Sequence, residues 1–262
     1  MLQDNLVKSS FHAIKQIVQE GLSQLGAMLM FLASAMYWTV RPPYRTKEIF
    51  RQLDFVGAQS VALIVMTGAF TGMVSALQGY NGMSRYGAES LVGATAALAL
   101  ARELGPVLTG LMIVGRVGSA MTAELGSMRN TQQIDALESM AVAPVQYLVC
   151  PRIVATTLTL PFLSAVFGFS GMIGAYIIST KYLQIDTGAF MSGIKDYLAA
   201  SDITQGLIKA FFFGFLLSLV ACFKGFYVEG GARGVGVATT QSVVLSSVLI
   251  LFSDYVMTTI MF

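Results

Sequence analysis

Two full charges stand side by side in the apolar segment ALARELGPVLTG, residues 99–110. The guanidinium of Arg102 can hold phosphate oxygens through two parallel hydrogen bonds, and Glu103 can balance that charge or meet an amine. Pro106 has no backbone N–H, so the carbonyl of Arg102 loses its helical partner and a kink is expected there. The segment therefore predicts a polar site for a charged ligand; a buried ion pair that only packs helices is the alternative.

Other kinds of site chemistry lack the residues they need. His12 is the single histidine, which leaves a histidine-based metal centre without ligands. Cys150 and Cys222 have no metal-ligand spacing and are expected to be small buried hydrophobes. No Gly-Lys dipeptide occurs, which excludes a phosphate-binding loop of the Walker A type. We expect no catalytic residue, no metal and no cofactor.

The composition is that of a protein embedded in a bilayer. Of 262 residues, 55% are hydrophobic and 11% are charged, against about 25% charged in soluble domains. The formal net charge of +2 gives no indication of nucleic-acid binding. Gly68 and Gly72 form a GxxxG pattern, which favours close helix packing. Five apolar runs have the length of transmembrane helices: 55–80, 90–123, 153–180, 207–223 and 238–262.

The N-terminal part, residues 1–54, has a different character from the five-helix domain expected over residues 55–262. Apolar residues recur at helical spacing over residues 1–21, which predicts an amphipathic helix on the inner leaflet, with an ordinary solvated helix as the alternative. The apolar run 25–40 is short and ends in Tyr37 and Trp38, residues typical of the headgroup level. We interpret this run as interfacial or re-entrant.

The basic residues between the apolar runs predict the orientation. With the N-terminus inside, the cytoplasmic segments hold ten Lys and Arg residues and the outer loops hold three. This bias favours an inside N-terminus, an outside C-terminus and five crossings. Residues near 133 should then lie inside and residues near 190 outside. Lys209 and Asp254 should lie at a similar outer depth, where they are predicted to pair; independent snorkelling of each is the alternative.

A short helix is predicted between the second and third apolar runs. QQIDALESMA, residues 132–141, consists of helix formers, and Pro144 follows it. Such a helix can dock in the groove of a cytoplasmic partner, whereas a partnerless helix on the bilayer surface is the alternative. The candidate contact residues are Gln132, Asp135, Leu137, Glu138 and Met140.

Two longer stretches carry a family resemblance. RELGPVLTGLMIVGRVGSAMTAELGSMRNTQQIDALESMAVAPVQYLVCPR, residues 102–152, and GVGVATTQSVVLSS, residues 234–247, resemble the MlaE family of ABC-transporter permeases. The resemblance extends from about residue 20 to the end of the chain. It implies an N-terminal interfacial helix followed by five transmembrane helices, in agreement with the hydrophobic pattern. It also implies that Tyr86, Arg102 and Glu103 line a lipid pocket, although Tyr86 equally suits an interfacial aromatic belt.

The same resemblance implies partners and a substrate. A permease of this family is a homodimer in the bacterial inner membrane, with two cytoplasmic ATPase subunits, a periplasmic MCE-domain protein and often a small STAS-domain protein. The implied substrate is a phospholipid moved between the inner and outer membranes, which maintains the lipid asymmetry of the outer membrane. Two other classes stay open: an ion-coupled secondary carrier, and a membrane-embedded lipid-modifying enzyme. The sequence has no internal repeat and no catalytic cluster to favour either.

Overall fold

The computed structural model describes residues 19, 23–42 and 45–261. The chain divides into two compact units, residues 1–44 and residues 45–262. In the first unit, residues 23–40 form a helix, and the Tyr37 and Trp38 rings meet edge to face with centroids 5.5 Å apart. The amphipathic helix expected over residues 1–21 lies outside the described residues, apart from Gln19.

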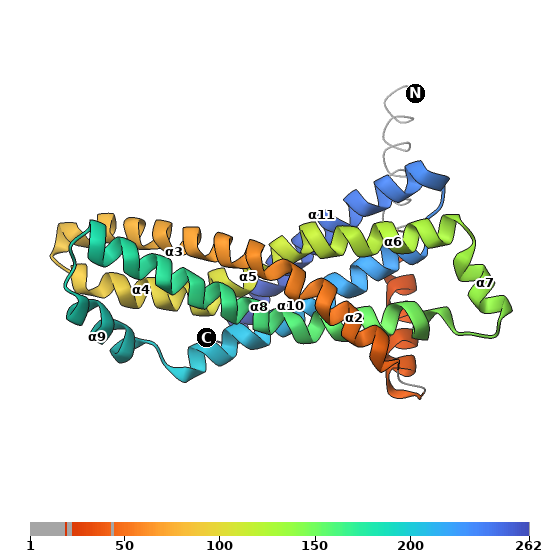
Figure 1. The fold of residues 1–262 in the computed structure, drawn as a ribbon, viewed down its shortest axis with the longest axis horizontal. Coiled ribbons are helices and arrows are strands. Elements are labelled where there is room, and N and C mark those ends of the chain that lie inside the picture. The colour runs from red at the N-terminus through yellow and green to blue at the C-terminus, as the bar shows by residue number, and fades with distance from the viewer. Residues whose placement is uncertain (1–18, 20–22, 43–44, 262) are drawn as a thin grey trace, which may run out of the picture. The chain divides into compact units, whose positions relative to one another are not determined.

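The second unit is an all-helical bundle (Figure 1). Five of the described helical segments are long and apolar enough to cross a membrane, as the hydrophobic pattern predicts. These spans are Thr46–Tyr86, Glu89–Asn130, Val145–Tyr182, Ala200–Phe226 and Gly231–Met261. The first contains α2 (Thr46–Val56), η1 (Ala58–Ser60), α3 (Val61–Met83) and η2 (Ser84–Tyr86). The second contains η3 (Glu89–Leu91), α4 (Val92–Ala99), η4 (Leu100–Leu104), α5 (Gly105–Ile113), η5 (Val114–Gly118) and α6 (Ser119–Asn130). The third contains η6 (Val145–Val149), α8 (Cys150–Ile177) and η7 (Ile178–Tyr182), and the last two are α10 (Ala200–Phe226) and α11 (Gly231–Met261).

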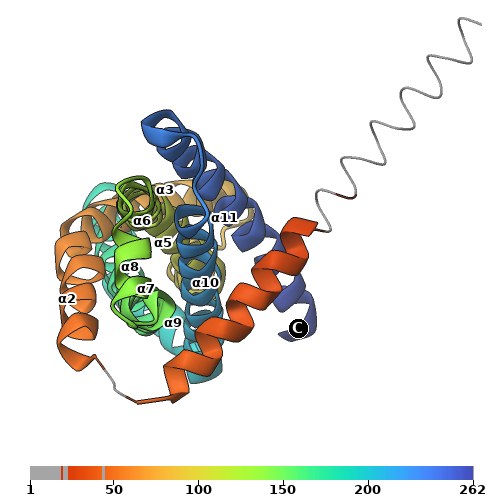
Figure 2. The same ribbon diagram turned by 90° about the vertical axis from the view of Figure 1, so that its right-hand side faces the viewer.

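Two short helices mark the two ends of the bundle. The predicted helix between the second and third spans is present as α7 (Gln133–Ser139), and α9 (Thr187–Tyr197) joins the third span to the fourth. Figure 1 shows α7 and α9 at opposite ends of the long helices. Figure 2 looks along the bundle from the α7 end and shows α2 and α10 on either side of α8. If the bundle crosses a membrane, α7 and α9 therefore lie on opposite sides of it.

Close packing of α3 on α8 holds the first and third spans together. Gly68 and Gly72 both face α8, and a Cβ at position 72 would collide with the carbonyl oxygen of Gly171. The GxxxG pattern thus lets the two backbones touch, as its spacing predicts. Side chains from all five spans fill the adjoining core, among them Ile64, Ile113, Leu160, Phe213 and Ile250.

The second span is interrupted by two π-helical turns, η4 and η5. In η4 the N–H of Gly105 bonds the carbonyl of Leu100, five residues back. Pro106 follows directly and cannot donate a hydrogen bond, so the regular ladder cannot continue through this point. The expected irregularity at Pro106 therefore takes the form of a widened turn, a feature frequently found at functional sites. Arg102 and Glu103 lie on this turn.

Candidate functional site

Arg102 and Glu103 enter two different surroundings. The Nη1 atom of Arg102 lies 3.7 Å from Oδ1 of Asp202, in the first turn of α10. The carboxylate of Glu103 accepts a hydrogen bond from Nζ of Lys209, at 2.5 Å. Neighbouring residues of a helix point in directions roughly 100° apart, which separates the two side chains. The two adjacent charges therefore make two separate contacts with the fourth span.

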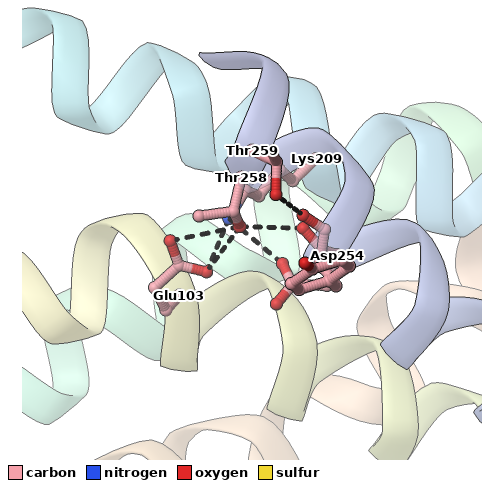
Figure 3. Close-up of polar contacts among 6 residues, drawn as sticks. Glu103, Lys209, Asp254, Thr258 and Thr259 are labelled. Atoms are coloured by element: carbon pink, nitrogen blue, oxygen red, sulfur yellow. Dashed lines mark hydrogen bonds and ion pairs between the residues drawn. The ribbon is translucent and has the colours of Figure 1, made fainter. Parts of the chain in front are cut away.

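Lys209 lies at the centre of a buried polar group, which we call the Lys209 cluster: Lys209, Glu103, Asp254 and Thr258 (Figure 3). Its side chain is completely buried, and Nζ also donates to the Thr258 hydroxyl at 2.8 Å. The Asp254 carboxylate forms an ion pair with Nζ at 3.1 Å. The predicted pairing of Lys209 with Asp254 is thus confirmed, and Glu103 is a third charged member that the sequence did not indicate.

The Lys209 cluster joins three spans. Glu103 comes from the second, Lys209 from the fourth, and Asp254 and Thr258 from the fifth. A buried ammonium is tolerated only when it is paired and hydrogen-bonded, and here one ammonium faces two carboxylates. Glu103 keeps 36% of its side-chain surface exposed. Glu103 therefore pairs with the buried lysine while part of its own side chain stays exposed.

The ion pair of Arg102 with Asp202 is longer than that of Glu103 with Lys209. The Arg102 side chain is 29% exposed, and the 3.7 Å separation from Asp202 exceeds a hydrogen-bond distance. The other oxygen of Asp202 accepts the N–H of Ala199 at 2.9 Å, so the carboxylate also caps α10. Sequence reasoning missed Asp202. Its signal was an acidic residue near the start of an apolar helix, where a capping role is common.

Tyr86 does not lie beside the charged pair. It is 86% exposed in η2, at the far end of the first span. The helix α4 and the short η3 separate it from Arg102 along the second span, and α4 alone accounts for about 12 Å at 1.5 Å per residue. The three residues proposed for one pocket thus occupy at least two levels of the bundle.

Arg116 fastens the second span to the junction of α2 and α3. Its guanidinium donates to the carbonyl of Phe55 at 3.2 Å, to the hydroxyl of Ser60, and to the side-chain oxygen of Gln59 at 3.3 Å. Gln59 and Ser60 belong to the short η1 turn, and Phe55 lies in the last turn of α2 just before it. This contact was not apparent from the sequence, because the partners lie more than 50 positions away from Arg116.

The helix α7 presents polar residues at one end of the bundle. Ile134 is completely buried and anchors the helix, and Leu137 is half-buried. Asp135 is held by Arg129 of α6 at 2.6 Å. The other three candidate contact residues are exposed: Gln132, which has a left-handed backbone (φ 58°), Glu138 and Met140. Four of the five candidates, Asp135 included, are thus exposed at this end of the bundle.

A family model described as "Permease MlaE" matches residues 49–260, from α2 to the end of α11. The chain belongs to the MlaE permease family. The matched region contains all the helices that carry Arg102, the Lys209 cluster and α7. The site and the α7 end described above are therefore parts of an MlaE permease.

Curated relatives extend this comparison to distant organisms. A probable ABC transporter permease protein of Rickettsia felis is 42% identical over 91% of this chain and 92% of its own. The intermembrane phospholipid transport system permease protein MlaE of Haemophilus influenzae is 39% identical over 82% of both chains. The chloroplastic protein trigalactosyldiacylglycerol 1 of Arabidopsis thaliana is 34% identical over 90% of this chain and 65% of its own.

In this MlaE permease, the two helices that flank α7 are tied together by a buried arginine. Arg152, at the start of α8, is 2% exposed and forms an ion pair with Glu124 of α6 at 2.8 Å. A second nitrogen of Arg152 donates to the carbonyl of Leu148 at 2.6 Å. In the sequence, Arg152 is only one of the ten basic residues of the cytoplasmic segments that predict the orientation. In the structure, Arg152 connects α8, which follows α7, to α6, which precedes it.

Proposed function

We propose that this chain is the membrane-spanning permease subunit of an ABC transporter that moves phospholipids between the inner and outer membranes and so maintains outer-membrane lipid asymmetry. The observation that carries the proposal is the 39% identity, over 82% of both chains, to the intermembrane phospholipid transport permease of Haemophilus influenzae. The partly exposed guanidinium of Arg102 fits this role, because it offers the donor geometry that suits a lipid phosphate. The chain itself is a non-catalytic subunit, and ATP is hydrolysed in a partner.

The candidate residues take different parts in this proposal. Arg102 binds the lipid phosphate, while the accessible side of Glu103 meets an amine headgroup as its other side holds Lys209. Tyr86 lies further along the path, at the α9 end of the bundle. In the bacterial inner membrane the permease acts as a homodimer with two cytoplasmic ATPase subunits, a periplasmic MCE-domain protein and, in some systems, a STAS-domain protein.

Purification tests the ATPase association directly. The tagged chain, extracted in mild detergent without crosslinker, should bring an ATPase subunit with it. The purified assembly in vesicles should then move labelled phospholipid only when ATP is supplied. A secondary carrier would need no ATPase, and a lipid-modifying enzyme would change the lipid chemically. Transport that follows an ion gradient without ATP would overturn the proposal.

Charge reversal on α7 should weaken the association with the ATPase. In the Asp135→Lys, Glu138→Lys double variant, like charges would face the basic residues of a complementary groove. We expect about tenfold less ATPase to co-purify, equivalent to ~1.4 kcal/mol, while the permease stays folded. Asp196→Lys is the matched control, since Asp196 is an exposed acid on α9 at the other end of the bundle. Unchanged association and turnover would instead favour a helix that lies on the bilayer without a partner.

Cysteine labelling in intact cells should reveal the orientation. A cysteine at the exposed position Lys195 of α9 should react with an impermeant reagent from outside, whereas one at the exposed position Gln133 of α7 should react only after the cells are opened. Cys150 and Cys222 are both buried, so the unmodified chain should give little background labelling. The reverse labelling pattern would contradict the inside N-terminus that the basic residues predict.

A further inference from the structure

The helix α7 is joined to the rest of the chain by a strained residue on each side. Gln132 before it and Ala141 after it both have left-handed backbones, with φ of 58° and 57°. A side chain makes this conformation unfavourable, and glycine usually takes such a position after a helix end. Strained bends of this kind persist only where the surrounding contacts hold them. The contacts on either side of α7 therefore fix its angle to α6 and to the segment that leads into α8.

On the α6 side, α7 is held directly. Ile134 of α7 is completely buried. Asp135, the next residue, forms an ion pair at 2.6 Å with Arg129 in the last turn of α6. One apolar contact and one charged contact thus connect α7 to the end of the second span, so a displacement of α7 also displaces the end of α6.

On the α8 side, Arg152 makes the connection. The chain passes from α7 into the π-helical turn η6, where the carbonyl of Leu148 accepts a hydrogen bond from Nη1 of Arg152 at 2.6 Å. The Nη2 atom of the same guanidinium forms an ion pair with Glu124 of α6 at 2.8 Å. One side chain of α8 therefore contacts both η6, which follows α7, and α6, which precedes it.

The two partners of this ion pair differ in their exposure to water. Arg152 is 2% exposed, whereas Glu124 keeps 49% of its side-chain surface. The Nε atom of Arg152 is also buried, without a hydrogen-bond partner among the described residues. Burying a charge in this way is costly, and apolar side chains of similar volume often pack equally well. Packing alone therefore gives no reason for a charge at position 152, whereas a fixed connection between α6 and α8 does.

We propose that Arg152 is a positioning residue that transmits movements of α7 to the third span through its ion pair with Glu124. The proposal rests on the proposed function, in which an ATPase subunit binds α7. A displacement of α7 reaches the end of α6 through the contacts of Ile134 and Asp135, and the ion pair makes the start of α8 follow it. Without the pair the second and third spans respond independently, so less lipid is moved for each ATP hydrolysed.

The ratio of lipid moved to ATP hydrolysed tests this connection. The full complex is placed in vesicles of phosphatidylethanolamine and phosphatidylglycerol that contain a trace of radiolabelled phosphatidylethanolamine, and lipid transport and phosphate release are measured in the same sample. In Glu124→Gln the ATPase should co-purify and hydrolyse ATP as in the wild type, but the ratio should fall about tenfold, within the usual range of coupling between two sites. Glu229→Gln is the matched control, since Glu229 is an exposed glutamate in the turn between α10 and α11.

A double variant separates transmission from packing. Arg152→Met with Glu124→Gln leaves no buried charge unpaired and fills much of the same volume, so its midpoint of thermal unfolding should be close to that of the wild type. The ratio should nevertheless stay low, because no ion pair joins α6 to α8. The double variant also decides the question if Glu124→Gln alone fails to assemble.

Three results would overturn the proposal: an unchanged ratio in an assembled Glu124→Gln complex, a ratio restored in the double variant, or a double variant that does not assemble. The second and third would assign the pair to packing and to assembly. Failure of the proposed function looks different, because the wild-type complex would then move no phospholipid when ATP is supplied.

Discussion

Replacing Lys209 by methionine should destabilise the permease by about 3–5 kcal/mol, the usual effect of removing one partner from a buried ion pair. The substitution keeps much of the side-chain volume but leaves Glu103 and Asp254 without the ammonium that they share. For a domain of this size, the midpoint of thermal unfolding should fall by roughly 10 °C. The measurement is loss of the monodisperse elution peak after heating the purified complex.

Neutralising the whole Lys209 cluster provides the decisive comparison. In the triple variant Lys209→Met, Glu103→Gln, Asp254→Asn no charge is left unpaired, so most of the lost stability should return. Lys195→Met removes an exposed lysine of α9 and should change little. Two results would show that the cluster does not hold the three spans together. One is a midpoint of thermal unfolding for Lys209→Met equal to that of the wild type, and the other is a triple variant that is no more stable than Lys209→Met.

Replacing Arg102 by alanine should leave the complex assembled but impair lipid handling. The ion pair with Asp202 is long and partly exposed, so its loss should alter stability by less than about 1 kcal/mol. A hydrogen bond to a charged group contributes about 1.5–3 kcal/mol, so the affinity for phospholipid should fall about 10- to 100-fold. Bound lipid and ATP-driven transport in vesicles are the two measurements.

Two further variants separate the guanidinium from a general positive charge. Arg102→Lys should restore part of the activity, because an ammonium is a point charge without the planar fork that fits phosphate. Arg85→Ala removes an exposed charge from the turn between α3 and α4 and should have a much smaller effect. Should Arg102→Ala fail to assemble, the residue packs helices; normal transport by an assembled Arg102→Ala complex would remove it from the lipid path.

The sequence alone determined the features that depend on neighbouring residues. Apolar runs of sufficient length specify the five spans, because each must satisfy its own backbone hydrogen bonds within lipid. The break at Pro106 and the short helix of α7 follow from local chemistry in the same way. The GxxxG pattern also indicated a close helix contact, although it did not name α8 as the partner. The pairing of Lys209 with Asp254 was predictable from their similar depths.

Only the tertiary structure shows how each helix is rotated about its own axis, and therefore which neighbours its side chains contact. When a span is apolar on every side, its sequence does not show which side packs against the other helices. The reason is that bilayer lipid and the protein interior are similarly apolar. The rotation of the second span is set by η4 and by the contact of Gly206 with Ala101. That rotation sends Arg102 to Asp202 and Glu103 to Lys209. The partners lie about 100 positions apart in the chain, and only the packing of the helices brings them together.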